Sequence, residues 1–203
     1  NEGLDKKGYI NLGFFGLGKV YFVSTKKTET ISSLAGVKIW NWHGDELVKA
    51  MIEVMDLTQV PLEITQVLSS LSTGMVEAVY GPPLGIVALQ WNTKVKYLIN
   101  FPLSYSMGAF LLKKEDWKRV PKEYRKKIKE ITAKYMVTFN KANKKDNEDA
   151  LEAMKSFGIK VIEFNKSDLK LAQRKREEII AKLLENKKLF SAEAVKRFKK
   201  AIN

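Results

Sequence analysis

Short apolar runs of strand length alternate along this chain with longer stretches of helical period. The runs Val37–Trp40, Met75–Tyr80 and Val95–Phe101 are rich in β-branched and aromatic residues, which predicts strands. Between the first two runs, apolar residues recur with the 3.6-residue period of an amphipathic helix, at Leu47, Met51, Val54 and Met55. Strands that alternate with helices predict an α/β fold.

The rest of the chain predicts further elements of both kinds. Tyr9–Gly18 is rich in glycine and is expected to be a loop, because its glycines lack the spacing of a dinucleotide-binding fingerprint. The stretch from Lys122 to about Phe157 contains no glycine or proline and predicts one helix, long enough to bridge two lobes. The other expected elements are strands at Lys19–Ser24, Tyr105–Leu112 and Ile159–Phe164, short helices at Glu29–Gly36 and Leu84–Trp91, a helix capped by Thr65 and ended by Gly74, and a last helix capped within Asn165–Asp168.

The segment 36–83 indicates where a ligand would bind. Its first strand ends in Trp40 and Trp42, and its second ends in Tyr80 followed by Gly81-Pro82-Pro83. Open α/β sheets bind ligands in the crevice beyond the carboxyl ends of their strands. The two turns therefore predict a crevice whose walls are aromatic and apolar.

Composition narrows the chemistry available to this crevice. The 203 residues are 45% hydrophobic, which is enough for a packed core. The chain has no cysteine and His43 is its one histidine, so disulfides, thiolate nucleophiles and zinc–thiolate sites are excluded and a serine triad has little to work with. An enzyme stays a third-ranked alternative, because the two turns supply only Asp45, Glu46 and His43 as titratable groups. The first residues do not form a signal peptide, and no apolar run reaches the roughly 18 residues of a membrane span.

The net charge of +13 makes a polyanion- or nucleic-acid-binding protein a second alternative. The distribution of the charge argues against it. Basic residues between Lys113 and Lys145 are interleaved with acidic ones, and the last segment alternates sign in the same way. Mixed signs along a helix are typical of a solvated face. We therefore expect no nucleic-acid partner.

Three motifs, in this order, resemble a known family. They are GVKIW beginning at Gly36, VPLEITQVLSSLSTGMVEAVYGPP beginning at Val60, and SMGAFLLKKEDWKRVPKEYRKKIKEITAKY beginning at Ser106. Together they are similar to the substrate-binding subunit of TRAP transporters, the DctP-like extracytoplasmic solute receptors. The resemblance spans about residues 13–158 and rests on the order of the motifs and on several spaced matches.

The resemblance implies a two-lobed periplasmic-binding-protein fold of type II, with the N-terminal lobe incomplete in this chain. Residues 1–18 and 107–146 would form the remainder of the N-terminal lobe with the bridging helix, and residues 19–106 and 147–203 the C-terminal lobe. It implies a non-enzymatic, extracytoplasmic or periplasmic protein without a cofactor, with membrane anchoring left open. Its partners would be a small-molecule ligand and the integral-membrane TRAP transporter subunits, and the lobes would close on the ligand like a hinge.

The sequence departs from the family at the residues that usually clamp a carboxylate. The resemblance places the arginine of the first strand at Trp40, a second basic position at Val20, and the asparagine of an Asn-Pro turn at Gly81, with Pro82 retained. A guanidinium gives a carboxylate two parallel hydrogen bonds, whereas an indole offers an apolar face and one N–H. We therefore expect an apolar or uncharged ligand, with a carboxylate held by a non-standard clamp as the alternative. The expected ligand-binding residues are Trp40, Trp42, Tyr80, Gly81, Pro82, Val20, Ile64, Leu68, Tyr105 and Met107.

Core packing is the competing interpretation for several of these side chains. A tryptophan at the end of a buried strand is more often part of the core than a ligand contact, and the apolar stripe that holds Ile64 and Leu68 is core by default. Trp91 and Trp117 are expected to be core or helix-anchoring residues, and His43 to be a surface or capping residue.

Overall fold

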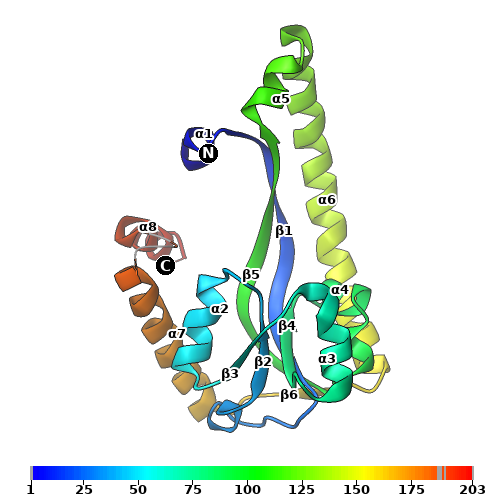
Figure 1. Cartoon of the computed structure of the whole chain (residues 1–203), viewed down its shortest axis with the longest axis vertical. Coiled ribbons are helices and arrows are strands. Elements are labelled where there is room, and N and C mark those ends of the chain that lie inside the picture. The colour runs from blue at the N-terminus through cyan, green and yellow to red at the C-terminus, as the bar shows by residue number, and fades with distance from the viewer. Residues whose placement is uncertain (1, 187–188, 190, 203) are drawn as a thin grey trace.

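The chain forms a broad lower lobe from which a tall, narrow upper part rises. The computed structural model describes residues 2–186, 189 and 191–202. In Figure 1 the sheet and most helices lie in the lower lobe, while two long strands and one long helix continue upward to a small helical tip. This is the two-lobed α/β architecture that the sequence predicts, with few elements in the upper lobe.

One mixed sheet of six strands organises the lower lobe, in the order β3-β2-β4-β1-β5-β6. β2 runs parallel to β3 and β4, β5 runs parallel to β6, and β1 runs antiparallel to its neighbours β4 and β5. The strands are β1 (Tyr9–Ser24), β2 (Lys38–Asn41), β3 (Thr58–Pro61), β4 (Ala78–Gly81), β5 (Tyr97–Lys113) and β6 (Lys160–Ile162).

The two long strands connect the lobes, and here the sequence prediction was partly wrong. β1 and β5 pair from Tyr9 opposite Lys113 to Ser24 opposite Tyr97, so the expected loop at 9–18 is strand. The glycines allow close packing instead, because a Cβ at Gly13 would lie 2.6 Å from Met136 Cγ. The two strands expected at Val95–Phe101 and Tyr105–Leu112 are one strand, because a register shift beside Pro102 accommodates the proline without ending the pairing.

The helices follow the sequence signals closely. α6 (Lys122–Ser156) is the predicted long helix, and Asp45 caps α2 (Glu46–Val54) by accepting the Val48 N–H. The cap predicted at Thr65 was wrong, because a 3₁₀ turn (Ile64–Gln66) with a capping box between Glu63 and Gln66 precedes the helix. The other helices are α1 (Glu2–Lys6), α3 (Val67–Thr73), α4 (Pro83–Ala88), α5 (Lys114–Arg119), α7 (Lys166–Asn186) and α8 (Ala192–Ile202), with further 3₁₀ turns at Ser32–Leu34 and Trp91–Thr93.

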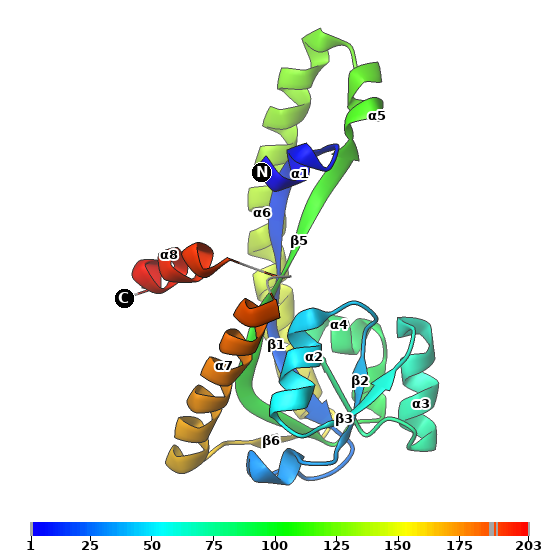
Figure 2. The ribbon, with the colours of Figure 1, turned by 60° about the vertical axis from the view of Figure 1, so that its left-hand side comes forward.

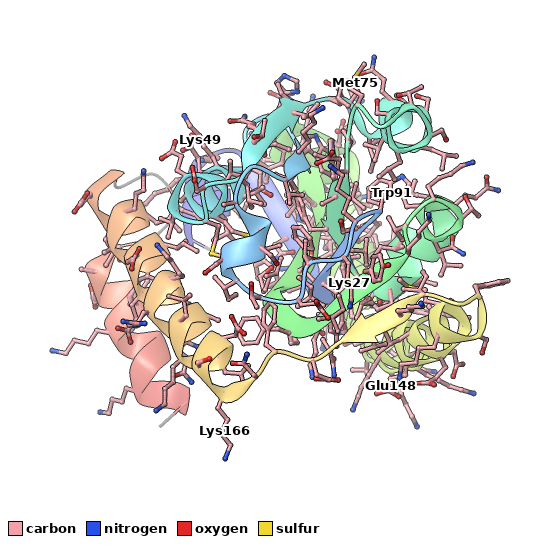
Figure 3. The ribbon with its side chains drawn as sticks, turned by 90° about the horizontal axis from the view of Figure 1, so that it is seen from below. Lys27, Lys49, Met75, Trp91, Glu148 and Lys166 are labelled. Carbon is pink, nitrogen blue, oxygen red and sulfur yellow. The ribbon has the colours of Figure 1, made fainter. Side chains whose placement is uncertain are left out.

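The sheet has a hydrophobic core on each face. One core includes Trp40, Val79 and Trp91 and lies on the side of α3, α4 and the lower end of α6. The other includes Phe22, Ile39 and Phe164 and lies on the side of α2 and α7. Seen from below, the two groups of helices flank the sheet (Figure 3). Trp91 and Trp117 are both buried, as predicted for core or helix-anchoring residues.

Candidate ligand site

The sheet topology brings the predicted turns to one edge. β2 and β4 run in the same direction, so their carboxyl ends at Asn41 and Gly81 lie on the same side of the sheet. β1 runs the opposite way and places Tyr21 opposite Gly81, and β5 places Ser104 opposite Val20. This edge faces the upper part of the molecule, where β1 and β5 leave the lower lobe (Figure 2).

Four aromatic rings gather at this edge. The ring of Trp40 stacks on that of Tyr80 with centroids 5.2 Å apart and on that of Trp42 at 6.1 Å, and it meets Trp91 edge-on at 5.2 Å. Stacked and edge-on aromatic pairs each add a favourable contribution beyond area burial, so the cluster is a rigid platform. Its outer ring, Trp42, is 49% exposed.

Trp40 supports this platform from within the core. Its side chain is only 3% exposed, and its indole N–H donates to the Leu62 carbonyl at 2.9 Å. The N–H donor that the sequence offers to a ligand is therefore already used by the protein. In this conformation Trp40 fixes the positions of Tyr80 and Trp42.

Tyr80 links the aromatic platform to the α2 side of the sheet. Its hydroxyl oxygen accepts the backbone N–H of Trp42 at 3.4 Å. Burial raises the pKa of the phenol well above its usual range, and the negative charge of Asp45 adds to this, while the Trp42 N–H opposes it. The phenol therefore stays neutral near pH 7 and presents a ring and one hydroxyl group.

A large apolar pocket lies on the α2 side of this edge. It has a volume of about 610 Å³ and is enclosed by β1, β4, β5, α2, α7 and α8. Pockets of this size accommodate small-molecule ligands. Val20 and Tyr80 are the two predicted site residues that line it, together with residues from each enclosing element such as Phe22, Leu47, Met51 and Leu103.

The other predicted residues lie elsewhere. Gly81 is buried in its strand, Pro82 precedes α4, and Ile64 and Leu68 pack against the core on the α3 side. Tyr105 and Met107 are 59% and 63% exposed on the upper part of β5. His43 is exposed, with its Nδ1 3.7 Å from Glu63 Oε1. Two of the ten predicted residues thus line the pocket, and Trp40, in the core on the α3 side, stacks on one of them, Tyr80.

Sequence reasoning missed several lining residues. Ser104 could have been found, because pairing of the two crossing strands places it opposite Val20. The lining residues of α7, including Lys175 and Arg176, carry no signal in a segment whose mixed charges indicate a solvated face.

Three asparagines fasten the crossing strand to the long helix. Asn140 Oδ1 accepts the Gly16 N–H at 2.8 Å, and Asn143 Nδ2 donates to the Gly16 carbonyl at 2.6 Å. One turn further, Asn147 Nδ2 donates to the Leu17 carbonyl at 2.9 Å and its Oδ1 accepts the Leu84 N–H at 3.2 Å. Asn147 therefore ties the point where β1 leaves the lobe to the helix that follows the Gly81-Pro82 turn.

Neither a metal site nor a membrane span emerges from the part of the chain that the structure describes. Residues 2–186, 189 and 191–202 contain no group of three or more His, Cys, Asp or Glu side chains that could hold a metal ion. The helices among these residues are all too short or too polar to cross a membrane.

Comparison with known proteins assigns the family. The family model described as bacterial extracellular solute-binding protein, family 7 (DctP), matches residues 1–187. The chain belongs to this family. It is 25% identical over 156 residues to the C4-dicarboxylate-binding periplasmic protein DctP of Rhodobacter capsulatus, a match that covers 76% of this chain and 46% of that protein.

Solved structures show the same fold. A TRAP periplasmic solute-binding protein from Haemophilus influenzae RdAW with bound L-gulonate matches with a TM-score of 0.90 at 16% identity, over 98% of this chain and 65% of that one. One from Desulfovibrio salexigens with bound orotic acid matches with a TM-score of 0.85 at 19% identity, over 98% of this chain and 64% of that one. The chain thus spans about half the length of the curated relative and less than two thirds of these structures.

Proposed function

We propose that this chain is part of an extracytoplasmic solute receptor of a TRAP-type transporter. The receptor captures a small molecule between its lobes and presents it to the integral-membrane subunits, without covalent chemistry. Family membership and the shared fold support this role and an extracytoplasmic or periplasmic location. Residues 19–106 and 147–203 form one lobe in this proposal, and residues 1–18 and 107–146 belong to the other.

The apolar pocket beside the strand ends carries the proposal for the ligand. It is lined by Val20 and Tyr80 near the crossing of β1 and β5, and all of its described lining residues belong to one proposed lobe, residues 19–106 and 147–203. In this proposal the other lobe closes over the pocket by a hinge motion at that crossing. Its walls are almost entirely hydrocarbon, so most of the binding free energy would come from burying an apolar surface. The ligand is accordingly one with a mainly apolar body that contacts the ring of Tyr80, which Trp40 supports from behind.

Relatives that bind acids support the alternative, in which a carboxylate is held by a non-standard clamp. The two solved relatives above hold L-gulonate and orotic acid, and the curated relative is named for C4-dicarboxylates. Here Trp40 is buried with its N–H engaged and Val20 is apolar, so a small hydrophilic acid would meet no cation from these two positions. A ligand carboxylate would need a cation from another element.

Ligand-dependent thermal stabilisation tests this function. The receptor is heated with L-malate, L-gulonate and orotic acid on one side, and with apolar acids and alcohols on the other. We expect the apolar compounds to raise Tm more, since only they fill the pocket. Val20→Thr keeps the side-chain volume but places a hydroxyl in the wall, so it lowers this response, while Val137→Thr on the exposed face of α6 leaves it unchanged. An equal or larger response to the hydrophilic acids would contradict the proposal.

A further inference from the structure

Positive charge lies on one wall of the apolar pocket. Among the described residues that line it, the charged ones are Lys175 and Arg176, both on α7, and no carboxylate is among them. The remaining walls are apolar apart from the hydroxyl groups of Tyr80 and Ser104. The pocket therefore combines a hydrocarbon interior with a single cationic side.

The helix itself leaves Arg176 without a counter-ion. Residues three and four positions away on a helix are its neighbours, and here they are Ala172, Gln173, Ile179 and Ile180. None is acidic, and Ala172, Ile179 and Ile180 line the pocket too. Among the described residues Arg176 has no ion pair, whereas Lys175 Nζ lies 3.0 Å from Glu178 Oε2. An arginine in this setting can bind a carboxylate with two parallel hydrogen bonds.

The opposite wall suits a hydrocarbon body. Met51 of α2 and Met55, which directly follows that helix, line it, and methionine side chains adapt to irregular apolar shapes. Phe22 and Leu103, from the crossing strands, complete a surface with no charge to desolvate. The volume of about 610 Å³ exceeds what a compact diacid needs and leaves room for an extended chain or fused rings.

We propose that the pocket takes an amphipathic monocarboxylate, with its hydrocarbon body against α2 and the sheet and its carboxylate on Arg176, assisted by Lys175. This inference rests on the proposed function and names its ligand class. The cation that the resemblance leads one to expect at the end of the first strand is supplied here from α7. The chain can then bind a negatively charged ligand although positions 40 and 20 hold a tryptophan and a valine instead of basic residues.

Calorimetric titration of the receptor with hexanoate, octanoate and decanoate, each beside the alcohol of equal length, tests the proposal. We expect affinity to rise about fourfold for each added methylene in both series, because each buries similar apolar surface. The acids should bind about tenfold or more tightly than the alcohols, as expected for a hydrogen bond to a charged group. Arg176→Gln should remove the advantage of the acids and keep the dependence on chain length. Arg174→Gln, an exposed change on the same helix outside the pocket, should change neither.

The outcomes distinguish a failure of the carboxylate assignment from a failure of the proposed apolar site. Acids and alcohols of equal affinity, or an acid advantage that survives Arg176→Gln, overturn the carboxylate assignment and leave the apolar pocket as the ligand site. If neither series binds while L-malate or L-gulonate does, both the ligand class and the proposed apolar site are wrong. A loss of all binding in Met51→Gln, with the Tm of the ligand-free protein unchanged, places the hydrocarbon body in this pocket.

Discussion

The indole Nε1 of Trp40 donates a hydrogen bond to the carbonyl oxygen of Leu62 at 2.9 Å. This bond joins the end of β2 to the segment after β3 and holds the ring face against Tyr80. At the position where the family resemblance places an arginine, the chain therefore has a core residue that supports Tyr80, which lines the pocket.

Trp40→Phe should destabilise the fold more than Trp42→Phe. The first change leaves the Leu62 carbonyl without its buried donor, which costs about 1–3 kcal/mol, and removes ring volume as well. Trp42 is half exposed, so its replacement should cost less than about 1 kcal/mol. Urea unfolding followed by circular dichroism measures both, and equal losses would contradict the core role of Trp40.

Alkaline pH should reveal the buried phenol of Tyr80. Its pKa is raised in the folded state, so the folded protein holds this proton more tightly than the unfolded chain does. The corresponding stability is complete below about pH 10, the ordinary pKa of tyrosine, and is lost as pH rises toward the higher folded value. The free energy of unfolding of the wild type should therefore fall above about pH 10, and Tyr80→Phe should flatten this fall.

The control for this measurement is Tyr124→Phe on the exposed face of α6. It removes a phenol from the chain without removing the buried one. A pH profile that Tyr80→Phe and Tyr124→Phe change equally would show that burial of Tyr80 does not account for the alkaline loss.

Asn147→Leu should loosen the junction between β1 and α6. The change leaves the Leu17 carbonyl and the Leu84 N–H without their partners, at about 1–3 kcal/mol for each group that stays buried. Lys144→Leu, an exposed substitution one turn earlier on the same helix, should stay within about 0.5 kcal/mol. Hydrogen exchange of the Leu84 N–H locates the effect, and unchanged protection of that amide would contradict the tie.

A second variant tests the same junction from the strand side. Gly18 has a φ of +127°, which side-chain-bearing residues rarely adopt, and a Cβ there would lie 3.0 Å from the Asn147 amide. Gly18→Ala should therefore destabilise the protein for two reasons, backbone strain at this φ and crowding of the new Cβ against Asn147. Gly36→Ala, where a Cβ meets open space, isolates the strain alone.

The sequence predicted helices α2 and α6 well because their signals are local. The helical period of α2 and the uninterrupted run of α6 each depend on neighbouring residues. The crossing strands were predicted poorly for the opposite reason. The glycines of β1 are strand residues because Met136 and Asn147, more than 120 positions away, pack over them.

The residues of the candidate site also differ in whether the sequence could predict them. Val20 was predicted through the resemblance and Tyr80 from its place at the end of a strand, and both line the pocket, whereas Trp40 lies in the core on the α3 side of the sheet. Arg176 could not be predicted, since an exposed arginine in a mixed-charge helix looks like surface until the opposing α2 and β5 are in place.

Ligand-driven closure is the most direct test of the account, and a chain without cysteine permits it. Spin labels on cysteines at Lys118, in the helical tip, and at Lys49, on α2, report the distance between the two proposed lobes. A pair at Lys49 and Met75 reports within one lobe (Figure 3). We expect decanoate to shorten and narrow the distance distribution between Lys118 and Lys49 and to leave the one between Lys49 and Met75 unchanged. A distribution between Lys118 and Lys49 that no ligand changes would contradict it.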